Sequence, residues 1–370
     1  MTARRRLALV ISSLGPGGAE RVLSTMANYW SAQGVDVTLL TLVASDSDFY
    51  PLDSRVARVG LNVAGASTGP LSAIAQNVGR VLALRHALLA AKPDAVISFG
   101  DRTNLSVALS LLGTRVPLVV AERSDPRHQQ LGILLESLRR LLYRNTVLVV
   151  QTESVRKWAV EILRCAALHV IPNPVSSDSG SGTATPRAAW VVSVGRLTPE
   201  KGHDLLLRAF AAIPSRDPLW RLCIAGDGPQ RAALLTLADE LTIAGAVDFL
   251  GTKKPIENLL RQAGIFVLPS RYEGFPNALL EAMANGAPVI AFDCPSGPAE
   301  IVTHGVDGLL VRAGDVAALA SAIGSLMADA QRREKLGVAA RAIARRFALD
   351  AVMQRWDEVL AASSSRRGAA

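Results

Sequence analysis

One segment most constrains the fold of this chain. It begins with the run Ile265-Phe-Val-Leu, continues with a loop from Ser270 and ends with a helix-favouring stretch that stops at Asn285-Gly286. A short, continuous apolar run is typical of a strand buried on both faces, as in a parallel sheet. Pro276 suits the first helical position, and Asn285-Gly286 suits a helix end. The segment therefore predicts a buried strand whose carboxyl end releases a loop into a helix.

Apolar strands alternate with helical segments through both halves of the chain, which predicts α/β domains with doubly wound parallel sheets. With 370 residues and 49% hydrophobic content, the chain can bury two cores. The Pro/Ser/Gly-rich stretch after Ile171 marks the boundary between them. We expect an N-terminal domain at 1–172, a linker at 173–188, a C-terminal domain at 189–346, a final helix at 347–362 and a disordered tail at 363–370.

Two carboxylates lie around the predicted helix start, Glu273 on the loop and Glu281 about a turn and a half into the helix. A helix amino terminus attracts phosphate through its unpaired N–H groups, and a carboxylate one turn further can accept hydrogen bonds from ribose hydroxyls. Such an arrangement suits a nucleotide diphosphate. The alternative is a solvated Glu281 and a capping Glu273, which for an isolated pair of acids is the commoner case.

Two cations follow another predicted strand, Trp190 to Gly195, since Arg196 and Lys201 come directly after it and Gly202 opens the next helix. Cations at the carboxyl end of a strand can offset the charge that builds on a diphosphate leaving group. Each could instead pair with a surface acid such as Glu200 or Asp204.

The spacing Glu273-x7-Glu281, ahead of Ala282-Met-Ala-Asn-Gly-Ala-Pro-Val-Ile-Ala, resembles the signature of the GT-B glycosyltransferases of family 4. Further blocks resemble the family's in the same order, namely 194–202, 224–229, 249–251, 298–302 and 305–311. Together they span most of the second half. The resemblance implies two Rossmann-like domains facing a cleft, with the last helix returning to the first domain. It also implies retaining, metal-independent transfer of a hexose or N-acetylhexosamine from a UDP-linked sugar in bacterial glycan synthesis.

The same resemblance assigns roles to individual residues. Arg196 and Lys201 stabilise the departing diphosphate, and Glu273 binds hydroxyls of the donor sugar. Pro276 stands where many members have glycine, which removes one N–H that could reach phosphate. The residues expected to bind the donor are Gly17, Gly18, Gly195, Asp227, Gly251, Gly274, Phe275, Asn277, Ala278 and Glu281, the last at the ribose.

Polar residues in the first half follow two predicted strands, at Asp101 and at Glu122. Strand ends of open α/β sheets border the ligand crevice. Asp101 and Glu122 are therefore candidates for orienting or deprotonating the acceptor hydroxyl, although either could pair with a neighbouring arginine. Many family members carry a histidine near the second position, whereas the aligned residue here is Arg123; His128 is a weaker candidate.

The net charge of +8 is concentrated in the first half, because residues 1–180 hold 19 Lys and Arg against 13 Asp and Glu. The segment 131–144 has leucines on one helical arc and Arg139, Arg140 and Arg144 on another. It could meet an anionic membrane or the diphosphate of a lipid-linked acceptor, or it could be an ordinary helix with its leucines in the core. Aromatic content of 5% and the lack of a nucleic-acid motif argue against nucleic acid as a partner.

Metal and cofactor signals are weak. The chain has three scattered cysteines, and Asp46 and Asp48 favour a solvated turn over a Mg²⁺ site. We expect no metal and no cofactor, with the nucleotide-sugar as a co-substrate and a lipid-linked or saccharide acceptor. The short apolar run after Arg4-Arg-Arg lacks a cleavage pattern, so we expect a cytoplasmic protein, peripheral on the inner face of the cell membrane.

Two other classes of protein stay open. An NAD-type oxidoreductase would also begin with strand, Gly-rich loop and helix, but Gly15-Pro-Gly-Gly lacks the Gly-x-Gly-x-x-Gly spacing. The second predicted strand also ends without the ribose-binding acid of that fold. A catalytically inactive protein that binds sugar-nucleotide or membrane would keep affinity for UDP without turning over a donor.

Overall fold

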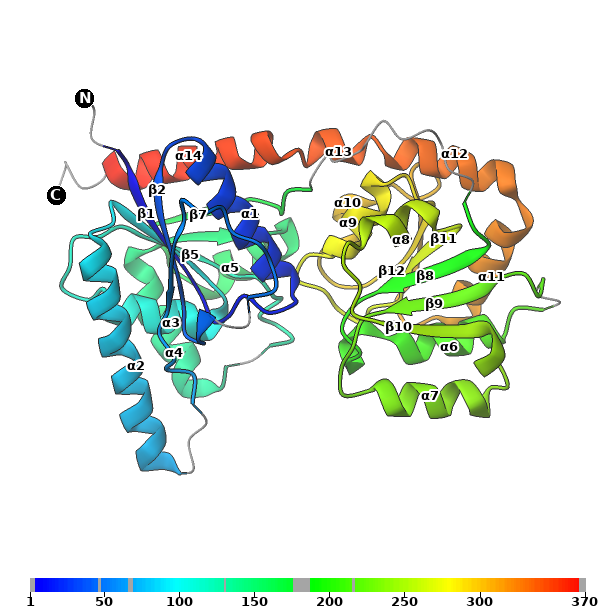
Figure 1. The fold of residues 1–370 in the computed structure, drawn as a ribbon, viewed down its shortest axis with the longest axis horizontal. Helices are drawn as coiled ribbons and strands as arrows, with labels where there is room; N and C mark the ends of the chain where they lie inside the picture. The colour runs from blue at the N-terminus through cyan, green and yellow to red at the C-terminus, as the bar shows by residue number, and fades with distance from the viewer. Residues whose placement is uncertain are drawn as a thin grey trace. The chain divides into compact units, whose positions relative to one another are not determined.

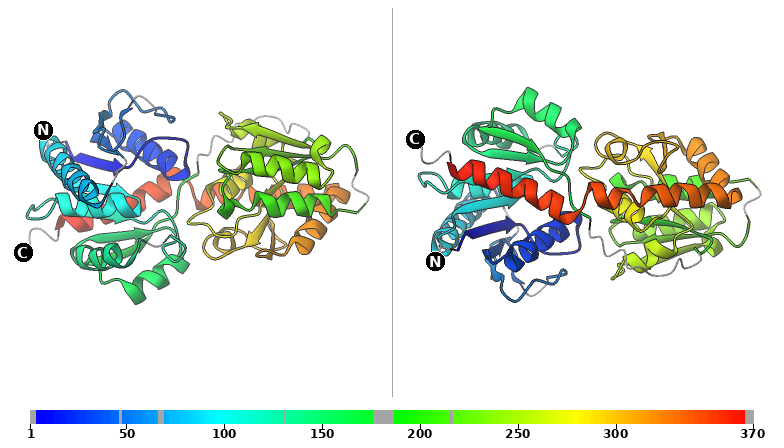
Figure 2. Two further views of the ribbon diagram at one scale, coloured as in Figure 1. Left: turned by 90° about the horizontal axis from the view of Figure 1, so that it is seen from below. Right: turned by 90° about the horizontal axis from the view of Figure 1, so that it is seen from above.

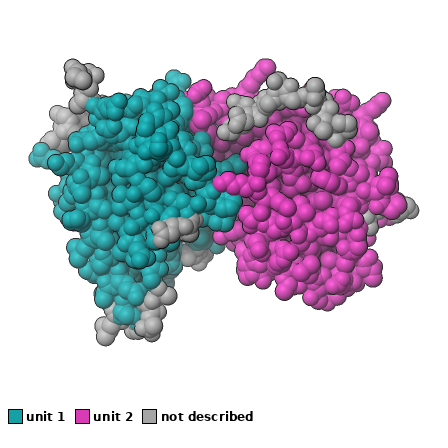
Figure 3. Space-filling view, in the orientation of Figure 1, with its two compact units in different colours: residues 1–172, 352–370 teal, residues 173–351 magenta. Residues whose placement is uncertain are grey.

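The computed structural model describes residues 4–45, 48–65, 69–129, 131–175, 187–214 and 217–365. It divides into two compact units, unit 1 at 1–172 with 352–370 and unit 2 at 173–351 (Figure 3). Each unit contains its own parallel sheet covered by helices (Figure 1). The predicted fold class, two Rossmann-like parallel-sheet domains, is confirmed.

Unit 1 has a seven-stranded sheet of order β3-β2-β1-β4-β5-β6-β7. Every pairing is parallel; Leu9 of β1, for example, faces Leu39 of β2 on one side and Ile97 of β4 on the other. The strands are β1 (Arg6–Ile11), β2 (Asp36–Thr41), β3 (Ala57–Gly60), β4 (Ala95–Phe99), β5 (Leu118–Ala121), β6 (Val147–Val150) and β7 (Ala167–Val170).

The helices of unit 1 cover both faces of its sheet (Figure 2). Helices α2, α3, α4 and α5 share one apolar core with the strands. Their bounds and those of the other helices are α1 (Gly18–Ala32), α2 (Pro70–Ala91), α3 (Asp101–Ser110), α4 (Ile133–Leu142), η2 (Tyr143–Asn145), α5 (Glu153–Ile162) and α14 (Leu349–Ser365).

Unit 2 has a six-stranded parallel sheet of order β10-β9-β8-β11-β12-β13. Alternate strand residues point to opposite faces, so Val191 lies in one core with α6, α7 and α11, while Val192 lies in a second core with α8, α9 and α10. The strands are β8 (Trp190–Val194), β9 (Arg221–Ala225), β10 (Val247–Gly251), β11 (Ile265–Leu268), β12 (Val289–Asp293) and β13 (Leu309–Arg312).

The helices of unit 2 include the one predicted after Pro276, which begins one residue later than expected, at Asn277, because Pro276 is its cap. Their bounds are η3 (Pro199–Lys201), α6 (His203–Ala211), α7 (Arg231–Glu240), η4 (Ala244–Ala246), α8 (Glu257–Gln262), α9 (Asn277–Ala284), α10 (Pro298–Ile301), α11 (Val316–Ala328), α12 (Ala330–Ala340) and α13 (Ile343–Arg346).

The last helix corrects one expectation. Helix α14 runs to Ser365, and Ser363 is buried, so the disordered tail predicted from 363 begins too early. Within unit 1, Trp356 of α14 is buried near the Phe99 ring, and Trp30 Nε1 donates a hydrogen bond to Asp357 Oδ1 at 2.9 Å. Most of the predicted linker, 176–186, and residues 366–370 lie outside the described residues.

Within the described ranges, no helix combines the length and the apolar composition that a membrane span requires.

Candidate active site

The candidate residues of unit 2 lie where the order of its strands reverses, between β8 and β11. Open α/β sheets bind ligands beyond the carboxyl ends of the strands at such a point. Strand β8 releases the segment from Gly195 to Gly202, and β11 releases the segment from Pro269 to Asn277. The topology therefore brings together two segments that lie about seventy residues apart in the sequence.

Lys201 and Glu273 form an ion pair at this point. Lys201 Nζ lies 2.8 Å from Glu273 Oε1 and 2.9 Å from Oε2, and the Ser270 hydroxyl donates to Oε1 at 2.6 Å. The Glu273 side chain is 5% exposed, whereas that of Lys201 is 23% exposed. A shielded carboxylate thus holds a lysine that remains accessible to a ligand. The sequence predicted both residues but not their contact.

Close approach of the two segments requires Gly202. Its φ is +65°, and an added Cβ would lie 2.0 Å from the carbonyl oxygen of Pro269. Arg271 ties the segments together, since its guanidinium donates to both Asp204 oxygens at 2.8 and 2.7 Å. The Arg271 N–H donates to the Glu200 carbonyl at 2.8 Å. Sequence reasoning missed Arg271; its position two residues before Glu273 was the available signal.

Arg196 and His203 flank Lys201 in the chain. Arg196 is exposed and lies close enough to Glu200 to help lower the pKa of that carboxyl. His203 is buried, and burial, followed by the charge of Lys201, lowers its pKa to about 4. Its ring is therefore neutral at pH 7, so Lys201 and Arg196 supply the positive charge of this segment.

Helix α9 carries the other predicted donor residues. Glu281 is buried in its second turn, and Asn277 and Ala278 are half-buried in its first. The Asn277 N–H donates to the Phe275 carbonyl at 2.9 Å, so this N–H already has a partner within the chain. The Phe275 ring is also buried, packed edge-on against Phe347 at 6.0 Å between centroids. Its side chain therefore belongs to the core and does not bind the donor.

The remaining donor candidates of unit 2 stand at the end of a strand or just after one. Gly195 donates its N–H to the Ala225 carbonyl at 3.0 Å. The Asp227 carboxylate accepts from the Gly228 N–H at 2.8 Å, and the Gly251 carbonyl accepts from Gly226 at 2.9 Å. An added Cβ on Gly226 would lie 1.9 Å from the Gly195 carbonyl oxygen, so close backbone approach explains that glycine. The predicted ligand contacts of Gly195, Asp227 and Gly251 stay predictions.

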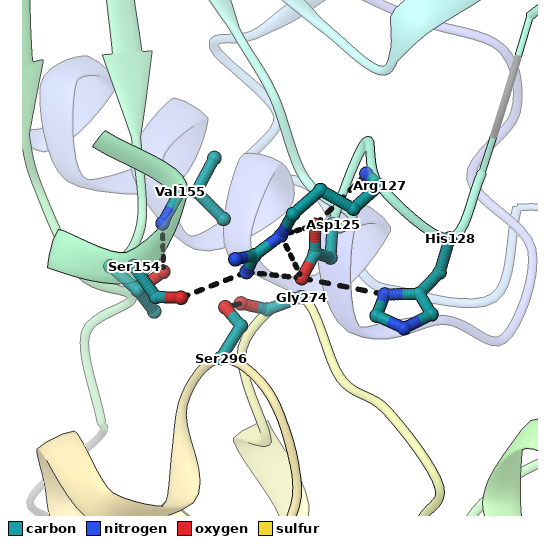
Figure 4. Close-up of polar contacts among 8 residues, drawn as sticks. Asp125, Arg127, His128, Ser154, Val155, Gly274 and Ser296 are labelled. Carbon is teal, nitrogen blue, oxygen red and sulfur yellow. Dashed lines mark hydrogen bonds and ion pairs between the residues drawn. The ribbon is translucent and has the colours of Figure 1, made fainter. Parts of the chain in front are cut away.

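Gly274 lies between Glu273 and Phe275 and accepts a hydrogen bond from the Ser296 hydroxyl at 3.3 Å (Figure 4). An added Cβ on Gly297 would lie 2.6 Å from Pro276 Cδ. The segment after β12 thus packs on the segment after β11 and helps to fix the Gly274 backbone.

In unit 1, Gly17 and Gly18 stand at the start of α1, after β1. Gly17 is the N-cap, and an added Cβ would lie 2.1 Å from Glu20 Oε2. Asp101 is the first residue of α3, and its carboxylate accepts from the Arg102 N–H at 2.6 Å. Asp101 is half-buried at the strand end, where the sequence placed it, and it also stabilises the helix start.

Glu122 differs from its expected role. It is buried, the Tyr143 hydroxyl donates to its Oε1 at 2.7 Å, and Arg139 Nη1 lies 3.7 Å from the same oxygen. Burial raises the pKa of Glu122 to about 6 despite the nearby Arg139 charge. Because Glu122 is 2% exposed and Tyr143 donates to its carboxylate, it is not placed to deprotonate an acceptor, and that prediction is wrong.

The basic residues of unit 1 divide into two groups. Arg139 is buried, pairs with Glu136 and lies over the Trp158 ring at 4.7 Å, so its assignment to an exposed basic face is wrong. Arg140 and Arg144 are exposed as predicted. Arg123 lies 3.5 Å from the Phe99 ring centroid and 5.6 Å from that of Trp356, and burial lowers its pKa to about 9.

A cluster that the sequence did not predict follows β5. The buried Asp125 carboxylate holds Arg127 through two oxygens, the shortest contact being 2.7 Å, and His128 Nδ1 lies 3.5 Å from its Oδ2 (Figure 4). Arg127 also donates to the Ser154 hydroxyl at 2.8 Å. The contacts of Asp125 with Arg127 and His128 span only a few residues, whereas the contact with Ser154 joins residues 27 positions apart. The available signal was Asp125-Pro126, which favours a turn.

The described ranges hold no group of three or more His, Cys, Asp or Glu side chains that is suited to a metal ion. Asp48 pairs with Arg58 at 2.7 Å, whereas Asp46 lies outside the described residues.

Known proteins resemble this chain along its whole length. Residues 16–179 match the family described as "Glycosyltransferase Family 4", and residues 182–343 match "Glycosyl transferases group 1". An exopolysaccharide phosphotransferase of Streptomyces coelicolor is 32% identical over 95% of this chain, but the chain spans only 40% of that protein. The Campylobacter jejuni GalNAc-alpha-(1->4)-GalNAc-alpha-(1->3)-diNAcBac-PP-undecaprenol alpha-1,4-N-acetyl-D-galactosaminyltransferase is 28% identical over 96% of this chain and 98% of its own.

Solved structures share the fold. Sucrose-phosphate synthase from Thermosynechococcus elongatus superposes with a TM-score of 0.82, at 20% identity, over 97% of this chain and 100% of its own. The Anabaena protein HepE in complex with UDP and glucose gives 0.80 at 21% identity, with the same coverage of both chains. The family matches and the paired parallel-sheet units agree with the motif resemblance, and the chain therefore belongs to the GT-B glycosyltransferases of family 4.

Proposed function

We propose that this glycosyltransferase moves a hexose or N-acetylhexosamine from a UDP-linked sugar to a lipid-linked or saccharide acceptor, with retention of anomeric configuration. The observation that carries the proposal is the Lys201–Glu273 pair at the strand reversal of unit 2. It combines a cation for a leaving diphosphate with a carboxylate for sugar hydroxyls.

Each member of the pair has a defined task. An ionised carboxylate offers about four lone-pair positions, and Lys201 and Ser270 occupy three of those on Glu273. The remaining position on Oε2 accepts a hydroxyl of the donor sugar. Lys201, together with Arg196, stabilises the charge that develops on the diphosphate as the bond breaks.

The reaction then needs no covalent intermediate. The acceptor oxygen bonds to the anomeric carbon on the face that the diphosphate leaves. The electrons of the broken C–O bond depart with the diphosphate, which takes up the acceptor proton. Glu281, buried on α9, binds the ribose in this proposal.

Names of related proteins support the donor and acceptor classes. The Anabaena structure contains UDP and glucose, and the name of the Campylobacter enzyme places its acceptor on a diphosphate-linked undecaprenol. Both chains match this one over nearly their full length.

The donor and acceptor can be tested by incubating the protein with individual nucleotide-sugars and extracted polyprenyl-linked acceptors, followed by mass spectrometry. We expect one hexose or N-acetylhexosamine mass increment from a UDP-sugar. Calorimetric titration with UDP and with NADH is the control. Binding of NADH but not UDP, with no mass increment, would contradict the proposal.

We also propose that α4 contacts an anionic membrane at the inner face of the cell membrane. Ile133, Leu134 and Leu141 are 86%, 85% and 58% exposed, which is unusual for large apolar side chains, and Arg140 and Arg144 are exposed in the same segment. Apolar side chains beside arginines fit the boundary between acyl chains and anionic headgroups.

Reversing both arginines, as Arg140→Glu with Arg144→Glu, should weaken binding to vesicles that contain anionic phospholipid by at least about 30-fold. Each positive charge near such a surface contributes about 1 kcal/mol, so losing two charges and adding two of the opposite sign exceeds 2 kcal/mol. Vesicle sedimentation measures this. The matched control is Arg208→Glu with Arg332→Glu, two exposed arginines of unit 2. Equal losses in the two double variants would refute a specific role for α4.

Metal removal gives a further test, since we propose that Lys201 and Arg196 take the place of a divalent cation. Exhaustive treatment with EDTA should leave the initial rate within about twofold, because side-chain cations stabilise the diphosphate. A rate that collapses with EDTA and returns with Mg²⁺ would show that Lys201 and Arg196 do not stabilise the diphosphate without a metal ion.

A further inference from the structure

A hydrogen bond links the beginning of unit 2 to its donor segment. Asn173 Nδ2 donates to Asn277 Oδ1 at 2.7 Å. Asn173 is 2% exposed, whereas Asn277 is half-buried as the first residue of α9. The two residues lie 104 positions apart, so this is a tertiary contact and not a local turn.

The segment that carries Asn173 is held by contacts with the residues just before α14. The Val175 N–H donates to the Phe347 carbonyl at 2.9 Å, and Val175 pairs with Ala348 in a parallel bridge. Phe347 in turn packs against Phe275, two residues before Asn277. The backbone beside Asn173 is therefore held, through Phe347, against the segment that carries Asn277.

The direction of the bond decides what Asn277 can offer a ligand. A primary amide has an oxygen that accepts and an NH₂ group that donates. Because Asn173 occupies the oxygen of the Asn277 amide, the NH₂ group remains. Glu281 on the same helix and Glu273 four residues earlier are acceptors, so Asn277 adds a donor to a segment that otherwise offers carboxylates.

We propose that Asn173 is a positioning residue, which presents the Asn277 NH₂ group to a diphosphate oxygen of the donor. This rests on the proposed function, because it assumes that a nucleoside diphosphate binds at α9. Asn173 itself is buried and does not touch the ligand.

The test is isosteric replacement, Asn173→Asp. A carboxylate can only accept, so the Asn277 amide must turn over to donate to it, and its oxygen then faces the diphosphate. We expect the Kd for UDP and the KM for the donor to rise about 10-fold or more, with kcat changed less than threefold. Asn173→Ala, which releases the amide without reversing it, should raise Kd by less than Asn173→Asp.

A double-mutant cycle separates this role from a purely structural one. In an Asn277→Ala background, Asn173→Asp should weaken UDP binding much less than it does alone, since the amide through which it acts is gone and only the added negative charge remains. Circular dichroism and thermal melting check that each variant folds. If Asn173→Ala is the more damaging single change, or if Asn173→Asp weakens UDP binding equally in both backgrounds, Asn173 acts by packing and the proposal is overturned.

Binding of UDP by the unsubstituted protein distinguishes failure of the proposed function from failure of this inference alone. If that protein does not bind UDP, the proposed function fails and this inference fails with it. If it binds UDP and Asn173→Asp binds equally well, only the inference fails.

Discussion

Replacing Lys201 with alanine is expected to lower kcat for the nucleotide-sugar by about 10²–10³-fold. The substitution removes the cation that stabilises the leaving diphosphate, and preorganised charges of this kind contribute about 3–4 kcal/mol to the transition state. Because the charge on the diphosphate grows as the bond breaks, kcat should fall more than KM rises. Steady-state kinetics with the preferred UDP-sugar measures both constants.

The substitution also leaves a carboxylate without its cation, because Glu273 is only 5% exposed. Breaking one side of a buried pair destabilises a protein, so reduced turnover could reflect a misfolded site. The double substitution Lys201→Met with Glu273→Gln removes both charges and should recover the melting temperature but not the turnover. Lys335→Ala, an exposed lysine on α12, is the matched control. Full turnover in Lys201→Ala would exclude Lys201 from the chemistry.

The architecture could be predicted because parallel strands buried on both faces leave a clear pattern. Runs such as Ile265–Leu268 are apolar throughout and are followed by Gly, Pro or polar residues. The same pattern shows where each strand ends, so Lys201 and Glu273 could each be assigned to the edge of the sheet at which the strands' carboxyl ends meet. Their direct contact could not be predicted, because it depends on the strand order and on how closely Gly202 lets the two segments approach.

Two of the failures, at Glu122 and Arg139, arose because a charged residue is buried. Helical periodicity places every arginine of α4 on a polar face, yet Arg139 turns inward because Glu122, after β5, is itself buried and attracts a cation. Nothing in the sequence shows that Glu122 is covered. Leu134, on the predicted leucine arc, is exposed, which disfavours the alternative that this arc lies in the core. The Asp125 cluster was missed for another reason. Its contacts with Arg127 and His128 lie in a turn that follows no helix or strand period, and the contact of Arg127 with Ser154 is tertiary.

The second large effect concerns stability. Arg139→Met should lower the free energy of unfolding of unit 1 by about 3–5 kcal/mol at pH 8, because it leaves the buried Glu122 carboxylate without a cation. Hydrogen exchange in peptides that cover β5 and β6, measured over a urea series, reads unit 1 separately from unit 2. The neighbouring Arg140→Met is the matched control; it removes an exposed charge and should change stability by less than about 0.5 kcal/mol.

The pH dependence tests whether Glu122 causes that loss. The folded-state pKa of Glu122 is about 6, above the ordinary value of 4.5 for a glutamate, so the folded protein binds the proton more tightly than the unfolded chain. This group therefore adds stability as the pH falls from about 6 to 4.5, by up to about 2 kcal/mol at 1.36 kcal/mol per pH unit.

Without Arg139, whose charge lowers the pKa of Glu122, that pKa rises further, and the protonated acid needs no cation. The deficit of Arg139→Met should thus be smaller at pH 5 than at pH 8, and Glu122→Gln with Arg139→Met should abolish the difference. A deficit independent of pH would instead assign the loss to the stacking of Arg139 on Trp158.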